Sequence, residues 1–275
     1  MSLTQASNFI FVQANAGKIG NLEENQARLS GLKSRRNENK MSIKLVFFDL
    51  EGTLLKPCYE YDKYKHLKVA PSLWTLIAEH LGNEALKEEE LTKQKWTKGK
   101  YRGYIEWMED TIKIHVKYGL TKRFFMNLIK QRIKYYRGVK ETLNELRKRN
   151  IKTALITGGF KQQADLVQKE LKIDHSFAAC EYFFDSKGKL VWFNLLPADY
   201  EGKIDFMRLL MREYKLNKQE VAFVGDGKND IPLAKEVGIS ICFNGDPELA
   251  RHCTYSINQP KGKEDFRSVL KYLLD

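Results

Sequence analysis

The sequence predicts an α/β fold, a doubly wound parallel sheet with a small inserted helical cap domain and an edge β-hairpin. Short apolar runs recur along the chain and are nearly continuous, as strands buried on both faces of a parallel sheet are. These runs are LVFF (45–48), TALI (153–156), VAFV (221–224) and ISICF (239–243). Helical patterns lie between and beside them, at 138–150, 160–172, 203–216 and 230–237. Strand and helix in alternation indicate a doubly wound core.

The spacing of the first two runs predicts the inserted domain. About a hundred residues separate them, whereas a crossover between parallel strands needs only about a dozen. The intervening residues have helical patterns without a convincing parallel strand, so we expect a helical cap at 59–136. The α/β core is then formed by 41–58 and 137–275.

A second feature departs from the alternation. The segment EYFFDSKGKLVWF (181–193) places aromatic and β-branched arms on both sides of a Ser-Lys-Gly turn. This pattern is typical of a hairpin, which we place at the edge of the sheet.

The first forty residues differ in composition from the rest. Residues 1–40 are rich in Asn, Gln, Ser, Lys and Arg and have no sustained period. We expect them to form a poorly ordered extension. Because MSIKLVFFD runs from Met41 directly into a strand, Met41 is also a candidate for the natural start.

Composition limits the class of protein. A hydrophobic content of 43% over 275 residues suits a globular fold. No apolar stretch approaches the roughly 18 residues that span a bilayer, and the four cysteines are scattered without a CxxC pair. We therefore expect a cytoplasmic protein that does not enter a membrane. The net charge of +12 suits either a nucleic-acid partner or an enzyme with anionic substrates.

Polar clusters follow three of the predicted strands. Asp49 and Glu51 come after the first run, Thr157-Gly158-Gly159 after the second, and GDGKND (225–230) after the third. Each cluster alone is ordinary turn chemistry. Because the carboxyl ends of parallel strands meet at one edge of a sheet, where ligands of such folds bind, together they predict a site.

The residue types in these clusters indicate phosphoryl transfer. Asp49 and Asp226 offer the hard oxygen ligands that Mg²⁺ prefers. The hydroxyl of Thr157 and the backbone N–H groups of the two glycines offer a seat for phosphate. Lys203, at the start of a predicted helix, is the best candidate for a cation facing it.

One alternative motif can be rejected for DGKND. A calcium-binding loop needs oxygen side chains at alternate positions followed by glycine. Here Lys228 takes the second ligand position and Ile231 takes the glycine position.

With these motifs, the chain resembles the haloacid dehalogenase superfamily of phosphohydrolases. The likeness covers 41–275 and is greatest toward its phosphoserine phosphatase-like members, because of ITGGF, GDGKND and the helical insertion. It implies a Rossmann-like core, Mg²⁺ as cofactor and an aspartyl-phosphate intermediate. It also implies roles for individual residues: Asp49 as nucleophile; Glu51 as general acid/base and, through its carbonyl, a metal ligand; Thr157, Gly158, Gly159, Lys203 and Asn229 for phosphate; Asp49, Asp226 and Asp230 for metal.

The chain departs from the superfamily pattern at two places. Glu51 stands where Asp is usual, so its carboxyl reaches about 1.5 Å further. In the cap, phosphoserine phosphatases use a glutamate and an arginine to hold the amino-acid head. Here the nearest acid is Glu60, two positions late, and Ile112 or Lys113 stands in the arginine's place.

These observations predict a Mg²⁺-dependent phosphatase acting on a small phosphorylated metabolite. Transfer of the phosphoryl group to an alcohol such as homoserine is the alternative, since Glu also occurs at the position of Glu51 in such a relative. A nucleic-acid-binding module with a vestigial site ranks behind both. The basic and aromatic stretch 93–107 could stack on single strands, but is better explained as part of a basic amphipathic cap whose aromatic residues pack and whose lysines stay in solvent. Assembly as a homodimer is a further expectation.

Overall fold

The computed structural model describes residues 42–57, 59–61, 67–69 and 72–274 of the chain, without the side chains of 59–61 and 67–69. The predicted extension 1–40 lies outside these residues. From Ile43 onward the chain forms one compact unit.

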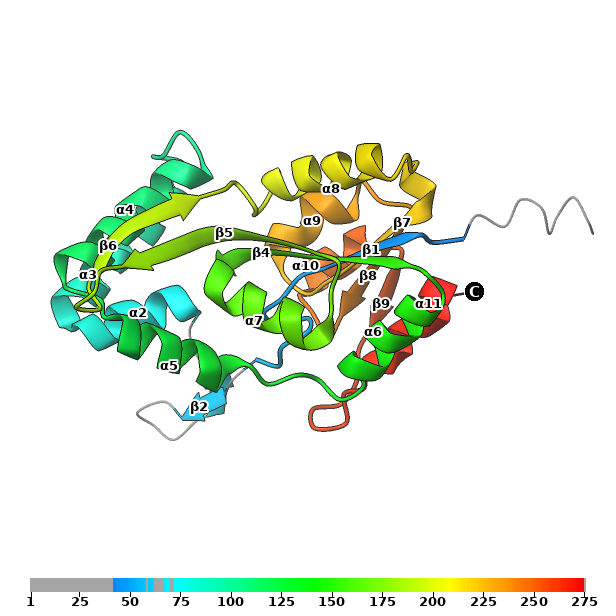
Figure 1. The fold of residues 1–275 in the computed structure, drawn as a ribbon, viewed down its shortest axis with the longest axis horizontal. Helices are drawn as coiled ribbons and strands as arrows, with labels where there is room; N and C mark the ends of the chain where they lie inside the picture. The colour runs from blue at the N-terminus through cyan, green and yellow to red at the C-terminus, as the bar shows by residue number, and fades with distance from the viewer. Residues whose placement is uncertain (1–41, 58, 62–66, 70–71, 275) are drawn as a thin grey trace, which may run out of the picture. The chain divides into compact units, whose positions relative to one another are not determined.

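A seven-stranded sheet forms the centre of this unit (Figure 1). Its spatial order is β6-β5-β4-β1-β7-β8-β9, and all neighbours are parallel except the antiparallel pair β5–β6. The strands are β1 (Leu45–Phe48), β4 (Lys152–Phe160), β5 (His175–Phe184), β6 (Leu190–Leu195), β7 (Val221–Gly225), β8 (Ile239–Phe243) and β9 (Tyr255–Ile257). This arrangement confirms the predicted fold class and places the predicted hairpin, β5–β6, at one edge.

Helices cover both faces of the sheet. Alternate side chains of each strand point to opposite faces, so an apolar strand exposes apolar side chains on both faces that the helices bury. In β1, Val46 and Phe48 belong to one apolar cluster, and Leu45 and Phe47 belong to another. All four are fully buried, which explains the continuous apolar run. The core helices are α6 (Val139–Lys148), α7 (Lys161–Leu171), α8 (Gly202–Glu213), α9 (Ile231–Ala234), α10 (Pro247–His252) and α11 (Leu270–Leu274); one-turn 3₁₀ helices are η1 (Lys218–Glu220), η2 (Lys228–Asp230) and η3 (Phe266–Val269).

The segment between β1 and β4 contains four longer helices. We call α2 (Leu73–Leu81), α3 (Asn83–Thr97), α4 (Tyr104–Lys117) and α5 (Lys122–Arg132) the cap helices. α2, α4 and α5 contribute to a third apolar cluster, which includes Phe160 of β4 and Tyr182 of β5, and α3 packs on α2 and α4. The carboxyl-terminal ends of β4 and β5 therefore pack against the cap helices. The sequence did not predict the short antiparallel pair in this segment, β2 (Tyr59–Tyr61) and β3 (Leu67–Val69).

The sequence also misjudged some boundaries. β4 extends through Thr157, Gly158 and Gly159 to Phe160, with an irregular register between Thr157 and Phe160. The Thr-Gly-Gly segment is thus an irregular end of a strand and not a loop. α9 ends at Ala234, short of the predicted 237. β9, a strand of three residues of which two are exposed, was not predicted.

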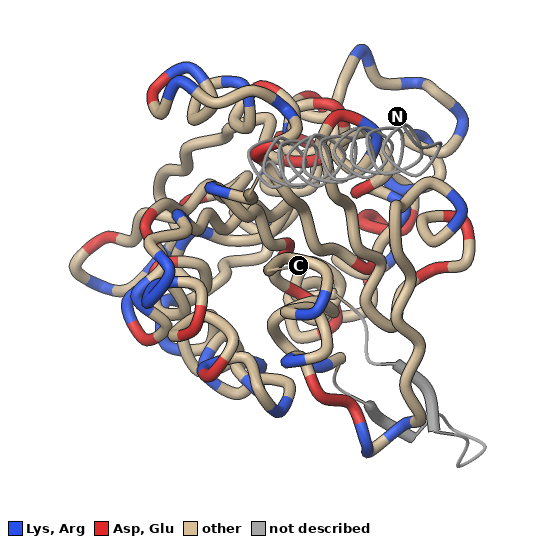
Figure 2. Tube along the Cα trace, turned by 90° about the vertical axis from the view of Figure 1, so that its right-hand side faces the viewer, with Lys and Arg blue, Asp and Glu red and all other residues tan. Residues whose placement is uncertain are grey.

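Charged residues of both signs alternate along the outer turns of the unit (Figure 2). In the basic stretch 93–107, Trp96, Tyr104 and Trp107 are partly buried, whereas Lys95 and Lys98 are exposed. The stretch spans the end of α3 and the start of α4, and this burial agrees with the predicted amphipathic cap. None of the helices within the described ranges has the length and apolar character needed to cross a membrane.

Candidate active site

Asp49 stands at the carboxyl end of the central strand. Its backbone N–H donates to the carbonyl of Val224 on β7 (3.0 Å), which continues the ladder by one residue. The chain then turns at Gly52, whose φ is +92°. A Cβ atom at Gly52 would collide with the carboxylate of Asp226. Only glycine therefore lets this turn close against the next acidic cluster.

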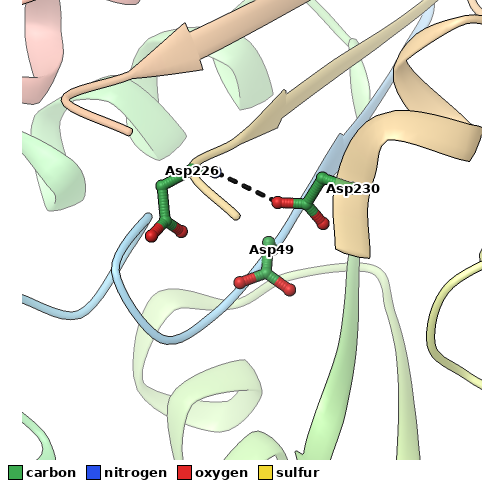
Figure 3. A group of neighbouring side chains, drawn as sticks. All are labelled: Asp49, Asp226 and Asp230. Carbon is green, nitrogen blue, oxygen red and sulfur yellow. Dashed lines mark hydrogen bonds between the residues drawn. The ribbon is translucent and has the colours of Figure 1, made fainter. Parts of the chain in front are cut away.

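Three aspartates meet at this edge of the sheet. Asp49, Asp226 and Asp230 each place a carboxylate oxygen within 4.8 Å of the others, and Figure 3 shows them around a common space. Asp230 Oδ2 accepts hydrogen bonds from the backbone N–H groups of Asp226 and Gly227, both at 3.1 Å. Thr53 donates a hydrogen bond to Asp226 Oδ1 at 2.7 Å. Backbone and hydroxyl donors thus fix the orientation of two of the three carboxylates.

Lys203 supplies a buried positive charge to this cluster. Its ammonium lies 2.7 Å from Asp49 Oδ1 and 2.6 Å from Asp230 Oδ1, and its side chain is fully buried in the first turn of α8. Asp199, four residues earlier in the chain, places Oδ1 3.8 Å from the ammonium of Lys203. Burial lowers the pKa of Lys203, but the carboxylates, Asp230 foremost, outweigh burial and raise the pKa above its ordinary value. Lys203 therefore stays protonated.

The carboxylates carry more negative charge than Lys203 can balance. Burial raises the pKa of Asp49 well above its ordinary value, although Lys203 opposes this rise. Burial and the neighbouring Asp230 raise the pKa of Asp226 to about 7. Such crowding disfavours the ionised forms unless a cation compensates. Three hard oxygen ligands within reach of one point fit a divalent ion such as Mg²⁺.

The Thr157-Gly158-Gly159 segment lies beside the aspartates. Thr157 is buried, and its Oγ1 accepts a hydrogen bond from the N–H of Gly159 at 3.1 Å. A Cβ atom at Gly158 would collide with the carboxylate of Asp199. The close packing explains the glycine at 158 and brings the segment to the wall of the site.

Glu51 and Asn229 complete the residues predicted from the sequence. Gln163 Nε2 on α7 donates a hydrogen bond to Glu51 Oε1 at 3.4 Å. Burial raises the pKa of Glu51, while Arg132 opposes the rise. Asn229 donates a hydrogen bond of 2.7 Å to Asp199 Oδ1. Neither side chain is a member of the three-aspartate cluster.

A cavity of about 310 Å³ lies over these residues. Asp49, Glu51, Thr157, Asp226 and Asn229 line its inner end. Asp199 and Tyr200, which precede α8, also line it. The cap helices and the N-cap of α2 contribute Ser72, Trp74, Glu89, Lys93, Tyr104, Trp107, Met108 and Thr111. The structure therefore brings every sequence-predicted site residue to one edge of the sheet, in or directly behind the cavity wall.

Comparison with known proteins decides the family. The sequence model of the haloacid dehalogenase-like hydrolases matches residues 43–238, which is more than half of the chain. The chain belongs to this family. The resemblance predicted from the motifs, and the enzyme class that goes with it, are thereby confirmed.

Several similar proteins are named phosphoserine phosphatase. A phosphoserine phosphatase from Saccharomyces cerevisiae is 27% identical over 259 residues, which cover 94% of this chain and 77% of that protein. One from Methanocaldococcus jannaschii is 26% identical over 240 residues, covering 84% and 97%. A solved phosphoserine phosphatase described as a phospho-aspartyl intermediate analogue superposes with a TM-score of 0.63 at 23% identity, covering 84% of this chain and 99% of the other. That superposition supports the fold.

The structure adds residues to this hydrolase site that the motifs did not predict. Asp199 contacts Lys203, Asn229 and Gly158 at once. Asp199 precedes α8 and is followed by a turn at Tyr200, whose φ is +48°, so no local periodicity indicated its contact with Lys203. Thr53, Gln163 and the residues contributed by the cap helices gave no signal, because their contacts depend on how distant segments pack.

Ile112 and Lys113, the two candidates for the arginine's place, do not line the cavity. Ile112 is fully buried in the apolar cluster of the cap helices. Lys113 is exposed and pairs with Asp110 at 3.0 Å. The side chain of Glu60 lies outside the part that the structure describes. The expected arginine thus has no equivalent at 112 or 113 in the cavity wall.

Proposed function

We propose that this chain is a Mg²⁺-dependent phosphatase that hydrolyses a small phosphomonoester through an aspartyl phosphate. One observation carries the proposal: Asp49 lines the inner end of the cavity and shares the buried Lys203 with Asp230. Asp49 Oδ1 accepts from Lys203, so Oδ2 is the oxygen left to attack phosphorus. The names of the similar proteins agree with this reaction class.

The first half of the proposed reaction transfers the phosphoryl group to the enzyme. Asp49 Oδ2 forms a bond to phosphorus as the bond from phosphorus to the leaving oxygen breaks. Glu51, which lines the same cavity with a raised pKa, donates its proton to that oxygen. The backbone N–H groups of Gly158 and Gly159, with Thr157, Lys203 and Asn229, are proposed to hold the phosphate oxygens.

The second half releases phosphate. A water attacks phosphorus and gives its proton to the Glu51 carboxylate, and the bond from phosphorus to Asp49 breaks. Asp49 is restored as a carboxylate and inorganic phosphate leaves. Asp49, Asp226, Asp230 and the carbonyl of Glu51 would hold Mg²⁺, which would supply positive charge that reduces repulsion between the nucleophile and an anionic ester.

Hydrolysis of p-nitrophenyl phosphate in Mg²⁺ tests the proposal. Asp49→Asn is expected to abolish turnover, because an amide cannot act as the nucleophile. Asp205→Asn is the matched control, since Asp205 is an exposed residue of α8. Full activity in Asp49→Asn would refute the proposal.

The acceptor of the phosphoryl group is a separate question. An alcohol that reached the aspartyl phosphate could replace water, and the sequence predicts homoserine as one such acceptor. Measuring phosphate release with and without homoserine distinguishes the two reactions. A phosphorylated product that forms only with the alcohol would support transfer.

A further inference from the structure

The walls of the cavity contain aromatic rings from two parts of the fold. Tyr104 and Trp107 come from α4, and Tyr200 comes from the segment before α8. We call these three residues the aromatic wall. The ring of Tyr104 lies 6.1 Å from that of Trp107, at 90°, and 6.2 Å from that of Tyr200. Trp96 supports the wall from behind, stacked 4.8 Å from Trp107.

A buried carboxylate, Glu89 of α3, lines the same chamber. Glu89 is only 1% exposed, although glutamates are almost never fully buried unless paired. Thr75 donates a hydrogen bond to its Oε1 at 3.1 Å, and Lys93 lies 3.0 Å from its Oε2. The helices therefore hold an anion at the cap side of the cavity.

Acidic side chains outnumber basic ones among the residues that line the cavity. Five carboxyl groups reach its surface, whereas Lys93 is the single lysine or arginine among the described residues there. Lys93 is already engaged by Glu89 and donates to Thr75 at 2.7 Å. Lys93 is therefore not free to pair with a carboxylate of the leaving group, and the described residues of this wall include no other lysine or arginine. The five groups are Asp49, Glu51, Glu89, Asp199 and Asp226.

We propose that the leaving group carries a positive charge and no carboxylate, so that the substrate is a phosphate ester of a small amino alcohol. Its ammonium, primary or methylated, would lie against the aromatic wall and share the Glu89 carboxylate with Lys93 as its countercharge. Aromatic faces attract organic cations, most strongly when the cation is desolvated.

This inference rests on the proposed phosphatase function and sharpens it. A phosphorylated amino acid brings a carboxylate as well as an ammonium, and would find a partner in this chamber for the ammonium alone. The charge of the leaving group therefore separates the two kinds of substrate.

A series of esters that differ in leaving-group charge tests the proposal. The series contains phosphocholine and phosphoethanolamine (cationic), glycerol 1-phosphate (neutral), L-phosphoserine (zwitterionic) and 3-phosphoglycerate (anionic). We expect kcat/KM for the cationic esters to exceed that for the neutral ester at least tenfold and that for the anionic ester at least a hundredfold. Equal or higher kcat/KM for the neutral, zwitterionic or anionic ester would overturn the inference.

Two variants test the assigned residues. Glu89→Gln is expected to lower the ratio of kcat/KM for phosphocholine to that for glycerol 1-phosphate at least tenfold. Glu90→Gln is the matched control, because Glu90 is the next residue and is exposed; it should retain the wild-type ratio. Trp107→Leu should lower the same ratio, which covers the case that Glu89→Gln fails to fold. An unchanged ratio in both folded variants would contradict the assignment.

Failure of the proposed function can be recognised separately. No Mg²⁺-dependent turnover of p-nitrophenyl phosphate would refute the phosphatase proposal itself. Calorimetric titration of the unmodified protein with choline, compared with glycerol, then still tests the chamber. Binding of choline but not glycerol supports a cation site, and equal or absent binding overturns it.

Discussion

The hydroxyl of Tyr104 donates a hydrogen bond of 3.1 Å to the carbonyl oxygen of Gly158. This bond joins α4, a cap helix, to the segment proposed to hold phosphate. The same ring forms part of the aromatic wall, so one side chain contacts both the cap side and the inner end of the cavity. Burial raises the pKa of Tyr104 well above its ordinary value, which keeps the hydroxyl protonated as the donor.

Tyr104→Phe should weaken catalysis by loosening this contact. A hydrogen bond of this type contributes about 0.5–1.5 kcal/mol. If the bond holds Gly158 in the reacting geometry, we expect kcat/KM for p-nitrophenyl phosphate to fall roughly two- to twelvefold. Tyr101→Phe is the control, since its hydroxyl bonds to Asp110, which does not line the cavity. Unchanged kinetics in Tyr104→Phe would show that the bond does not position the segment.

Lys203→Met should be strongly destabilising. It removes the buried ammonium that lies between Asp49 and Asp230 and leaves both carboxylates without it. Breaking a buried ion pair from one side costs about 3–5 kcal/mol. We expect a loss of this size in the free energy of unfolding, measured with urea in the absence of Mg²⁺.

The control for Lys203 is Lys161→Met at the start of α7. Lys161 pairs with Asp165 at the surface, and exposed pairs contribute only about 0–1 kcal/mol. A loss in Lys203→Met as small as that in the control would contradict the assigned role of the buried ammonium.

How far the sequence predicts this molecule depends on the range of the interactions. β1 and β8 have the predicted boundaries because their buried runs are continuous. The three acidic and Thr-Gly clusters converge because parallel strands end at one edge. β9 was missed because it is a short edge strand with two exposed residues, which gives no continuous apolar run.

The cavity walls illustrate what local patterns cannot predict. Glu89 looks like one acid of the run EEE (88–90), and only the packing of α3 buries it while Glu90 stays exposed. Tyr200 reaches the cap side from a segment about a hundred residues away in sequence from Tyr104. Such contacts depend on tertiary packing, whereas the catalytic motifs depend on strand ends that the sequence already marks.

Two substitutions at Glu51 distinguish the contribution of its exchangeable proton from the contribution of its side-chain length. Glu51→Gln cannot exchange a proton, so kcat should fall by about 10²–10⁴. Glu51→Asp keeps the carboxyl but shortens its reach by about 1.5 Å, so we expect kcat to fall between the wild type and Glu51→Gln. Steady-state kinetics with p-nitrophenyl phosphate measures both. Glu79→Gln, at an exposed position of α2, is the control; equal activity of Glu51→Gln and the control would reject Glu51 as acid/base.

Removal of metal should abolish the activity, and the aspartates should set the affinity for Mg²⁺. We expect EDTA to stop turnover and added Mg²⁺ to restore it. Asp226→Asn loses a carboxylate ligand, so it should need at least about tenfold more Mg²⁺ for half-maximal rate. Thr53→Val only removes the hydrogen bond that orients Asp226, so its requirement should rise less. Identical Mg²⁺ requirements in Asp226→Asn and the wild type would exclude Asp226 as a ligand.

His115 should make the folded chain sensitive to acid. It is fully buried in α4, with Nδ1 at 2.7 Å from the hydroxyl of Tyr182 and its ring stacked near Trp74. Burial lowers the pKa of His115 to about 3 from 6.5. The unfolded chain therefore binds a proton that the folded chain refuses, and the free energy of unfolding falls as pH decreases from about 6.5 toward 3.

The expected loss in the free energy of unfolding follows from the difference between the pKa values of His115 in the folded and unfolded chain. At pH 5 the contribution of His115 to stability is lower than at pH 8 by about 2 kcal/mol. Urea unfolding of the wild type and of His115→Gln at both pH values measures it, because the difference between the two proteins cancels other titrating groups. His252→Gln, at an exposed position of α10, should keep the wild-type pH dependence. If His115→Gln keeps it as well, the buried imidazole is not the source of the acid sensitivity.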